Sequence, residues 1–284
     1  MPPTATTPAT ETTPAATAAT AATKAKDTRG TRTTRGLRRA LLPVGAAAVL
    51  LTVWELSCRV FGVPQYVLPM PSDIWGSLTE DTALLMDNAW PTIIESALGF
   101  LVGNVVAVLL AVVFVHFRSV ERALMPVALF IRTIPIVAIA PILVIMMGNG
   151  YAPKVAIGAL ISFFPTLVNM VRGLQSVDQQ SLELLRVLSA SPWEVLFKVR
   201  VYASLPYLFS SLKIATGNCV IGAIVAEWIG SQKGLGYLII QTTYNFNTPQ
   251  LYAVMVIASA VAIVFYAAVG VAEKLTVRWE AKTP

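Results

Sequence analysis

The apolar residues of this chain stand in long blocks, and this pattern limits the possible folds more than any other feature. The first block lies at about 40–57, and five more lie at roughly 90–115, 134–149, 154–172, 206–228 and 251–272. A helix needs about 20 apolar residues to cross the hydrocarbon core of a bilayer. Charged residues make up only 13% of the chain, about half the share in a soluble domain. We therefore predict an all-α membrane protein with about six transmembrane helices.

Lysine and arginine residues predict the orientation of these helices. With six spans, both termini share one side, and most basic residues border that side, including seven that precede the first block. The opposite side receives only Arg59, Lys154 and Lys233. Because basic loops stay in the cytoplasm, we expect a multi-pass membrane protein with cytoplasmic N- and C-termini. Residues 173–205 then lie in the cytoplasm.

Composition divides the chain into four predicted segments. The first is rich in Thr, Ala and Pro and then basic, and such a segment has too few large apolar side chains to fold. The segments are a disordered tail at 1–36, the first span with an external segment at 37–88, the core transmembrane domain at 89–275, and a cytoplasmic tail at 276–284.

Several classes of function have no support in the sequence. Cys58, Cys219 and the single histidine, His116, form no cluster with the spacing of a metal site. No basic face with interleaved aromatic residues predicts binding to nucleic acid. The phosphate-binding pattern G-x-x-x-x-G-K-[ST] does not occur, so we do not expect this chain to bind or hydrolyse ATP. No set of titratable residues predicts an active site within the membrane.

A charged and interrupted helix, ELLRVLSASPWEVLFKVR at 183–200, lies in the predicted cytoplasmic segment. Asp178 can cap a helix over about 179–189. Ser191, with Pro192 after it and Glu194 three residues on, fits a capping box with proline at the first helical position. The pattern thus predicts two short helices joined by a turn at 189–191.

Two interpretations of this helix pair follow from its residues. It can be an amphipathic connector that lies on the membrane surface. It can instead be a docking element, because Trp193 and Phe197 beside charged residues suit the anchor of an interface. Physical reasoning alone leaves both open.

The motifs around the helix pair carry a family resemblance. ELLRVLSASPWEVLFKVRVYASLP resembles the cytoplasmic signature of permease subunits of bacterial ABC importers, E-A-A-x-x-x-G followed by I-x-L-P. Three further segments are similar to motifs of the branch that transports nitrate, sulfonates, taurine and thiamine-precursor pyrimidines. They are VLPMPSDIW at 67–75, RTIPIVAIAPILVI at 132–145 and VAEWIGSQKGLGYLI at 225–239. The resemblance extends over about residues 40–280.

The signature is not matched at every position. Leu184 and Leu185 stand where alanines are usual, and Ser189 replaces the glycine of the turn. Serine permits a tight turn, but it has a steric cost there if its φ is positive. Val201 and Tyr202 replace the first Leu-Pro, while Pro206 keeps the later proline.

The resemblance implies a fold, partners and a mechanism. The fold is that of a type I ABC importer permease with a cytoplasmic coupling helix pair, paired with a second permease copy as a homodimer. A separate ATPase subunit carries ATP and magnesium, so no cofactor is expected on this chain, and an extracellular binding protein delivers the substrate. The implied ATPase-coupling residues are Glu183, Leu184, Leu185, Arg186, Leu188, Ser189, Ala190, Ser191, Trp193 and Glu194.

Charged and polar residues within the apolar blocks are candidates for the translocation pathway. A charge at membrane depth usually faces a cavity or a partner, and we predict a pathway or gate role for Arg132, with Pro135 of the same motif, for Asn169 and for Glu227. The alternative for the charges is local pairing or an interfacial position. For Asn169, as for Asn104 and Asn218, the alternative is an interhelical hydrogen bond. Gly99 and Gly103 form a G-x-x-x-G pattern that predicts close helix packing within the protomer.

The implied substrate is a small polar or anionic solute, such as a sulfonate, nitrate, taurine, or a pyrimidine- or riboflavin-type vitamin precursor. The segments RTIPIVAIAPILVI and VRVYASLPYLF resemble the pyrimidine- and riboflavin-type permeases more than the sulfonate ones. The alternative function is a self-sufficient secondary carrier. Such a carrier is expected to show inverted repeats and several midplane charges, and the sequence shows no convincing repeat.

Overall fold

The computed structural model describes residues 42–277. The predicted disordered tail at 1–36 and nearly all of the predicted C-terminal tail lie outside the described residues. Every regular element within the described range is a helix, which confirms the all-α prediction. Five helices are long and apolar enough to cross a membrane, or six if one sharply bent helix pair counts as a single span.

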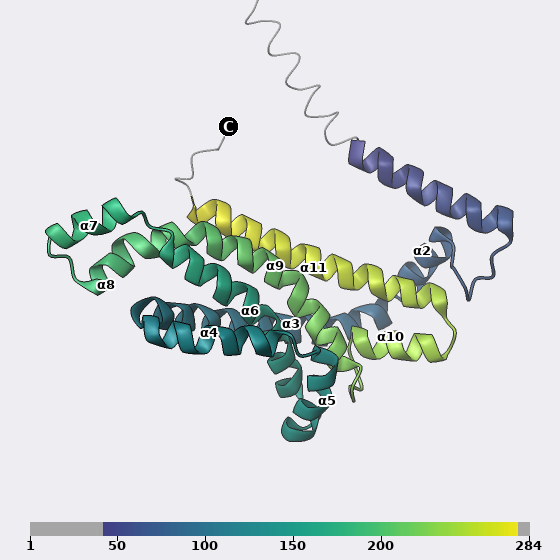
Figure 1. Cartoon of the computed structure of the whole chain (residues 1–284). Coiled ribbons are helices and arrows are strands. Elements are labelled where there is room, and N and C mark those ends of the chain that lie inside the picture. The colour runs from purple at the N-terminus through teal and green to yellow at the C-terminus, as the bar shows by residue number, and fades with distance from the viewer. Residues whose placement is uncertain (1–41, 278–284) are drawn as a thin grey trace, which may run out of the picture. The chain divides into compact units, whose positions relative to one another are not determined.

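The chain divides into two units between Val63 and Pro64. The first unit contains the apolar helix Leu42–Phe61. The second unit contains all the other elements (Figure 1). These are α2 (Pro71–Glu80), α3 (Thr82–His116), α4 (Arg118–Arg132), α5 (Ile136–Met147), α6 (Tyr151–Gln175), α7 (Gln179–Val187), α8 (Pro192–Val195), the π-turn η1 (Leu196–Arg200), α9 (Val201–Glu227), α10 (Leu235–Tyr244) and α11 (Thr248–Thr276).

Helices α3, α6 and α9 form the centre of the second unit, and small residues let them approach closely. A Cβ on Gly103 would lie 2.4 Å from the carbonyl oxygen of Ala159, and a Cβ on Gly99 would lie 3.1 Å from the backbone of Gly158. The G-x-x-x-G pattern therefore packs α3 against α6 within the protomer, as predicted. The Thr166 hydroxyl also donates to the amide oxygen of Asn104 across the same pair, which confirms the interhelical interpretation for that asparagine.

The third predicted span is wrong in its start and its shape. The residues between the second and third predicted spans form the helix α4. Helices α4 and α5 meet at a 97° bend. Val120, Met125 and Ala128 pack along the core formed by α3 and α6, so α4 runs back beside α3. Fifteen helical residues extend about 22 Å, so Arg118 and Arg132 lie at opposite ends of α4.

The predicted second short helix is not separate from the fifth span. Helix α8 continues through η1 into α9, so residues 192–227 form one helical segment of 36 residues. Proline inside a helix removes one backbone hydrogen bond, but α9 continues through Pro206. Tertiary packing overrides the local preference here, since α9 packs along both α3 and α6. The consequence is a direct mechanical connection between the cytoplasmic signature and a central span.

Candidate functional site

The helix pair of the signature forms a hairpin at one end of the bundle, while α10 lies at the other end (Figure 1). We call residues 178–200 the hairpin. Its two helices begin at the predicted caps. The Asp178 side chain accepts a hydrogen bond from the backbone N–H of Ser181 at 2.9 Å. Ser191 and Glu194 form the predicted capping box, in which the Glu194 carboxylate accepts from the Ser191 N–H at 3.0 Å.

The turn of the hairpin forces serine into a backbone conformation that favours glycine. The Ala190 N–H donates to the Leu185 carbonyl and the Ser189 N–H donates to the Arg186 carbonyl, both at 3.0 Å. This pattern is a Schellman motif, which places a left-handed residue just after the helix. Ser189 occupies that position with φ of 56°. Ser189 therefore has the steric cost that was expected for serine in this turn if its φ is positive.

Large apolar side chains cover the outer surface of the hairpin. Leu188 is 67% exposed and Trp193 is 58% exposed. Leu185, which was predicted to contact the ATPase with them, is half-buried. We define the docking surface by its exposed apolar members, which are Leu184, Val187, Leu188, Trp193 and Phe197. Large apolar side chains gathered in this way on one hairpin suit an interaction site.

The base of the hairpin is fixed to three transmembrane helices. Leu196 is buried in the core that α3 and α6 form. The Arg200 guanidinium donates to the Leu174 carbonyl at the end of α6, at 3.2 Å. The Trp193 ring lies 4.7 Å from the His116 ring at the end of α3. A force on the docking surface therefore reaches α3, α6 and α9 together.

The charges of the hairpin differ in how they are satisfied. Glu194 accepts hydrogen bonds from the Ser191 N–H and hydroxyl and pairs with Lys198 at 3.1 Å. Led by the Ser191 N–H bond, these contacts lower the pKa of Glu194 from 4.5 to about 2. Glu183 accepts only a long bond from the Gln179 amide, at 3.3 Å. Glu183 and Arg186 form no ion pair with another described residue, so both charges are available to a partner.

The bend between α4 and α5 creates a pocket of about 430 Å³. Arg132 and Pro135, both predicted pathway residues, line it together with Asn218. The other lining residues are mostly aliphatic and aromatic side chains of α5, α6 and α9. Arg132 has no carboxylate partner among residues 42–277. A cation in a largely apolar pocket suits an anionic or carbonyl group of a small molecule.

The other two predicted pathway residues lie elsewhere. The Asn169 amide donates to the Pro165 carbonyl one turn earlier on α6, at 2.9 Å. Glu227 does not line the pocket beside Arg132. It is 1% exposed and lies at the end of α9, where it contacts α3 and α10.

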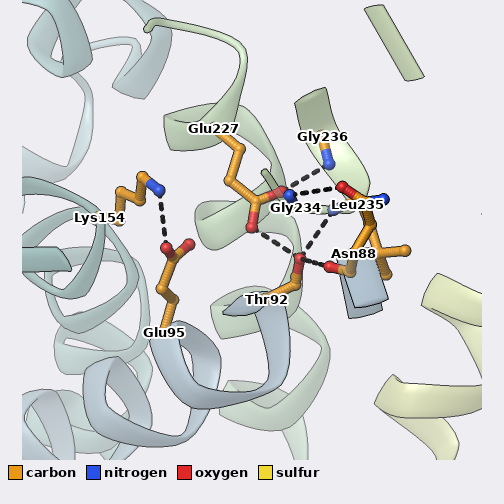
Figure 2. Close-up of polar contacts among 8 residues, drawn as sticks. All are labelled: Asn88, Thr92, Glu95, Lys154, Glu227, Gly234, Leu235 and Gly236. Atoms are coloured by element: carbon orange, nitrogen blue, oxygen red, sulfur yellow. Dashed lines mark hydrogen bonds and ion pairs between the residues drawn. The ribbon is translucent and has the colours of Figure 1, made fainter. Parts of the chain in front are cut away.

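Glu227 holds the N-terminus of α10 by direct hydrogen bonds (Figure 2). Its carboxylate accepts the Gly236 N–H at 2.5 Å and the Thr92 hydroxyl at 2.6 Å. Thr92 in turn accepts the Leu235 N–H at 2.9 Å. We call this set, which also includes Asn88 accepting the Gly234 N–H at 3.0 Å, the Glu227 latch. It satisfies three of the backbone donors that a helix N-terminus leaves free.

The glycines of the VAEWIGSQKGLGYLI motif make the latch possible. A Cβ on Gly236 would lie 2.3 Å from the Ile224 carbonyl, and a Cβ on Gly234 would lie 2.3 Å from the Glu227 carboxyl carbon. Gly234 also has φ of 127°, which other residues rarely adopt. The sequence reasoning singled out Glu227 and this glycine-rich turn. It missed Thr92 and Asn88, since their partners lie about 140 residues away.

Glu95 is a further buried carboxylate that the sequence reasoning missed. It is 0% exposed, and Lys154 donates to its Oε1 at 2.7 Å. An acidic residue within an apolar block, as in TIIESALGFLV, was the available signal.

Comparison with known proteins assigns this architecture. Residues 103–279 match the family described as the binding-protein-dependent transport system inner membrane component. A probable ABC transporter permease protein of Haemophilus influenzae is 33% identical over 80% of this chain and 93% of its own length. The formylaminopyrimidine transport permease protein ThiX of Halalkalibacterium halodurans is 33% identical over 86% of this chain and 98% of its own. The riboflavin transport system permease protein RibX of Chloroflexus aurantiacus is 30% identical, over 84% and 90%.

A solved structure gives the same picture of the fold. A chain from the methionine ABC transporter MetNI in an inward-facing conformation superposes with a TM-score of 0.61 at 17% identity, over 68% of this chain and 95% of that one. The likeness confirms the predicted fold, that of a type I ABC importer permease.

Proposed function

This chain belongs to the family of binding-protein-dependent transport system inner membrane components, and from this membership we propose that it is the pathway-forming permease subunit of an ATP-driven importer. In this proposal an ATPase subunit hydrolyses ATP on the cytoplasmic side, and an extracellular binding protein delivers the substrate. A second copy of the chain completes the pathway as a homodimer.

The docking surface is the observation that carries the proposal. Five large apolar side chains are exposed on a hairpin outside the spans, and burying them against a partner would remove that apolar area from water. Leu196 and Arg200 hold the base of the hairpin against the transmembrane helices, and α8 continues into α9. We therefore assign the docking surface to the ATPase, with Glu183 and Arg186 forming polar contacts at its rim. Closure of the ATPase dimer then moves α3, α6 and α9 as one body.

Co-purification with the cognate ATPase tests this assignment. We expect Leu184→Ala and Leu188→Ala each to weaken the association by about tenfold, because truncating a buried interface anchor costs about 1–2 kcal/mol. Leu109→Ala is the matched control, since Leu109 is 62% exposed on α3 and Leu184 is 61% exposed on the hairpin. Equal ATPase affinity in all three variants would contradict the assignment.

The pocket beside Arg132 is our proposed contact for the substrate. Its single cation and its apolar walls suit a small solute that is partly apolar and carries an anionic or carbonyl group. Two relatives are named for formylaminopyrimidine and riboflavin transport, and both of these compounds are heteroaromatic with carbonyl oxygens. We therefore favour a vitamin-precursor heterocycle over a sulfonate, nitrate or taurine.

The binding protein offers the cleanest test of the substrate, because it can be screened alone in water. A ligand present at 100 times its Kd stabilises a protein by about 2.7 kcal/mol. We expect pyrimidine or flavin compounds to raise the melting temperature of the cognate binding protein. A shift with sulfonates alone would overturn the substrate proposal and leave the permease proposal intact.

A further inference from the structure

Two buried carboxyl groups meet beside the Glu227 latch, and only one cation accompanies them. Glu95 comes from α3 and Glu227 from the end of α9, and Figure 2 shows the two side chains facing each other. Lys154 from α6 donates to Oε1 of Glu95, and its side chain is only 12% exposed. If both carboxyl groups were ionised, this buried cluster would carry a net negative charge. Burying an uncompensated charge is strongly unfavourable.

One atom of the cluster lacks a hydrogen bond. Oε2 of Glu95 is buried and accepts no hydrogen bond from any residue in the described range. Figure 2 shows this oxygen on the side of Glu95 that faces Glu227, away from Lys154. A buried acceptor without a donor costs the desolvation of that group. A proton between Oε2 and the Glu227 carboxyl group removes both difficulties, because it joins the two groups by a hydrogen bond and makes the cluster neutral.

We propose that Glu95 and Glu227 together bind one proton, which lies between Oε2 of Glu95 and the Glu227 carboxyl group. The Glu227 latch is then a proton-dependent fastening of α10. With the proton bound, the pair carries one negative charge, which Lys154 balances, and the Glu227 oxygens accept the Gly236 N–H and the Thr92 hydroxyl. When the proton leaves, two carboxylates repel each other, and the hydrogen bonds that hold the start of α10 loosen.

The surroundings define which groups take part. The charged groups that act on the pair are Lys154 from α6 and the two carboxyl groups themselves. The Tyr151 ring lies 5.8 Å from the Lys154 ammonium. The Asp87–Lys233 ion pair fastens the same loop at 2.8 Å, but both of its side chains are more than half exposed. The inference concerns the latch alone and is independent of the proposed transport function.

Infrared spectroscopy of the purified full-length protein tests the proton directly. We expect wild-type protein at neutral pH to show the carbonyl stretch of a protonated carboxyl group, and to lose it as the pH is raised. Glu95→Gln removes that group but keeps a neutral side chain that can accept from Lys154 and donate to Glu227. The band should be absent in this variant. Only ionised carboxylates in wild-type protein, or an unchanged band in Glu95→Gln, would overturn the proposal.

Amide hydrogen exchange at Leu235 and Gly236 tests the consequence for α10. In wild-type protein, protection should fall roughly tenfold once the proton is lost, as expected when a hydrogen bond to a charged group is released. Glu95→Gln should stay protected throughout. Glu227→Gln should be unprotected throughout, because an NH₂ group replaces one acceptor oxygen. Unchanged protection in the α3–α6 core shows that each variant is folded. Equal pH dependence in wild type and Glu95→Gln would contradict the inference.

Discussion

Among single residues, Ser189 occupies a backbone conformation that its side chain disfavours. It adopts φ of 56° at the end of a Schellman motif, and a left-handed conformation costs an L-residue about 1–2 kcal/mol. We expect Ser189→Gly to raise the free energy of unfolding by about 1 kcal/mol. Ser189→Val should lower it, because a β-branched side chain tolerates this conformation least. Chemical denaturation in detergent measures both. Destabilisation by both variants alike would show that the strain is not stored at Ser189.

Gly236 is the residue on which the Glu227 latch depends sterically. Its Cβ would lie 2.3 Å from a backbone carbonyl, so we expect Gly236→Ala to lower the free energy of unfolding by about 1–3 kcal/mol. Gly217→Ala on α9 is the control, because nothing lies within 4 Å of a Cβ there. Alanine at that helical position should be neutral or stabilising by up to about 1 kcal/mol. A tolerated Gly236→Ala would mean that α10 does not rest on Glu227 as described.

At the scale of elements, the second helix of the hairpin is started by its capping box. Since hydrogen bonds and Lys198 lower the pKa of Glu194 to about 2, the ionised carboxylate stabilises the folded hairpin. This stabilisation is complete above the ordinary pKa of 4.5 and is lost as the pH falls toward about 2. Hydrogen exchange of α8 should therefore be unchanged between pH 7 and 5, after correction for the intrinsic rate, and should rise below that range. Glu194→Gln should remove the dependence.

The N-cap of the same helix gives a second prediction. Ser191→Ala removes the side-chain acceptor for the Glu194 N–H, and losing an N-cap costs about 1 kcal/mol. Because the cap orients Trp193 and the turn, we expect weaker binding to the ATPase, by up to about fivefold, with normal folding of the spans. Isothermal titration with the cognate ATPase measures the effect. Gln180→Ala on α7, an exposed position outside both caps, should bind normally.

The hairpin could be predicted from the sequence because its caps are formed by residues close together in the chain. The Glu227 latch could not, because its residues are far apart in the chain. Asp178, Ser191 and Glu194 act within four residues of their partners, so their caps could be recognised from the sequence. The bend at Thr133–Pro135 was missed because an apolar run does not reveal whether it is one straight helix. The proton-sharing pair joins Glu95 to Glu227 across 132 positions of the chain. No local pattern specifies such a contact.

For the whole molecule, the proposed orientation predicts which ends face which compartment. The hairpin with Lys198 should be cytoplasmic, and the loop with Lys233 should be external. Both native cysteines are buried, so a single added cysteine dominates labelling by a membrane-impermeant reagent. In intact cells we expect Lys233→Cys to be labelled and Lys198→Cys to be protected until the membrane is opened. The reverse pattern would contradict the orientation.

Substrate uptake into proteoliposomes tests the central claim most directly. The permease would be reconstituted with its ATPase and binding protein, and the three components and ATP would be omitted in turn. Our account predicts uptake only when ATP and all three components are present, with loss of uptake in the Leu188→Ala variant. Uptake by the permease alone, driven by an ion gradient without ATP or ATPase, would show a secondary carrier and would contradict the account.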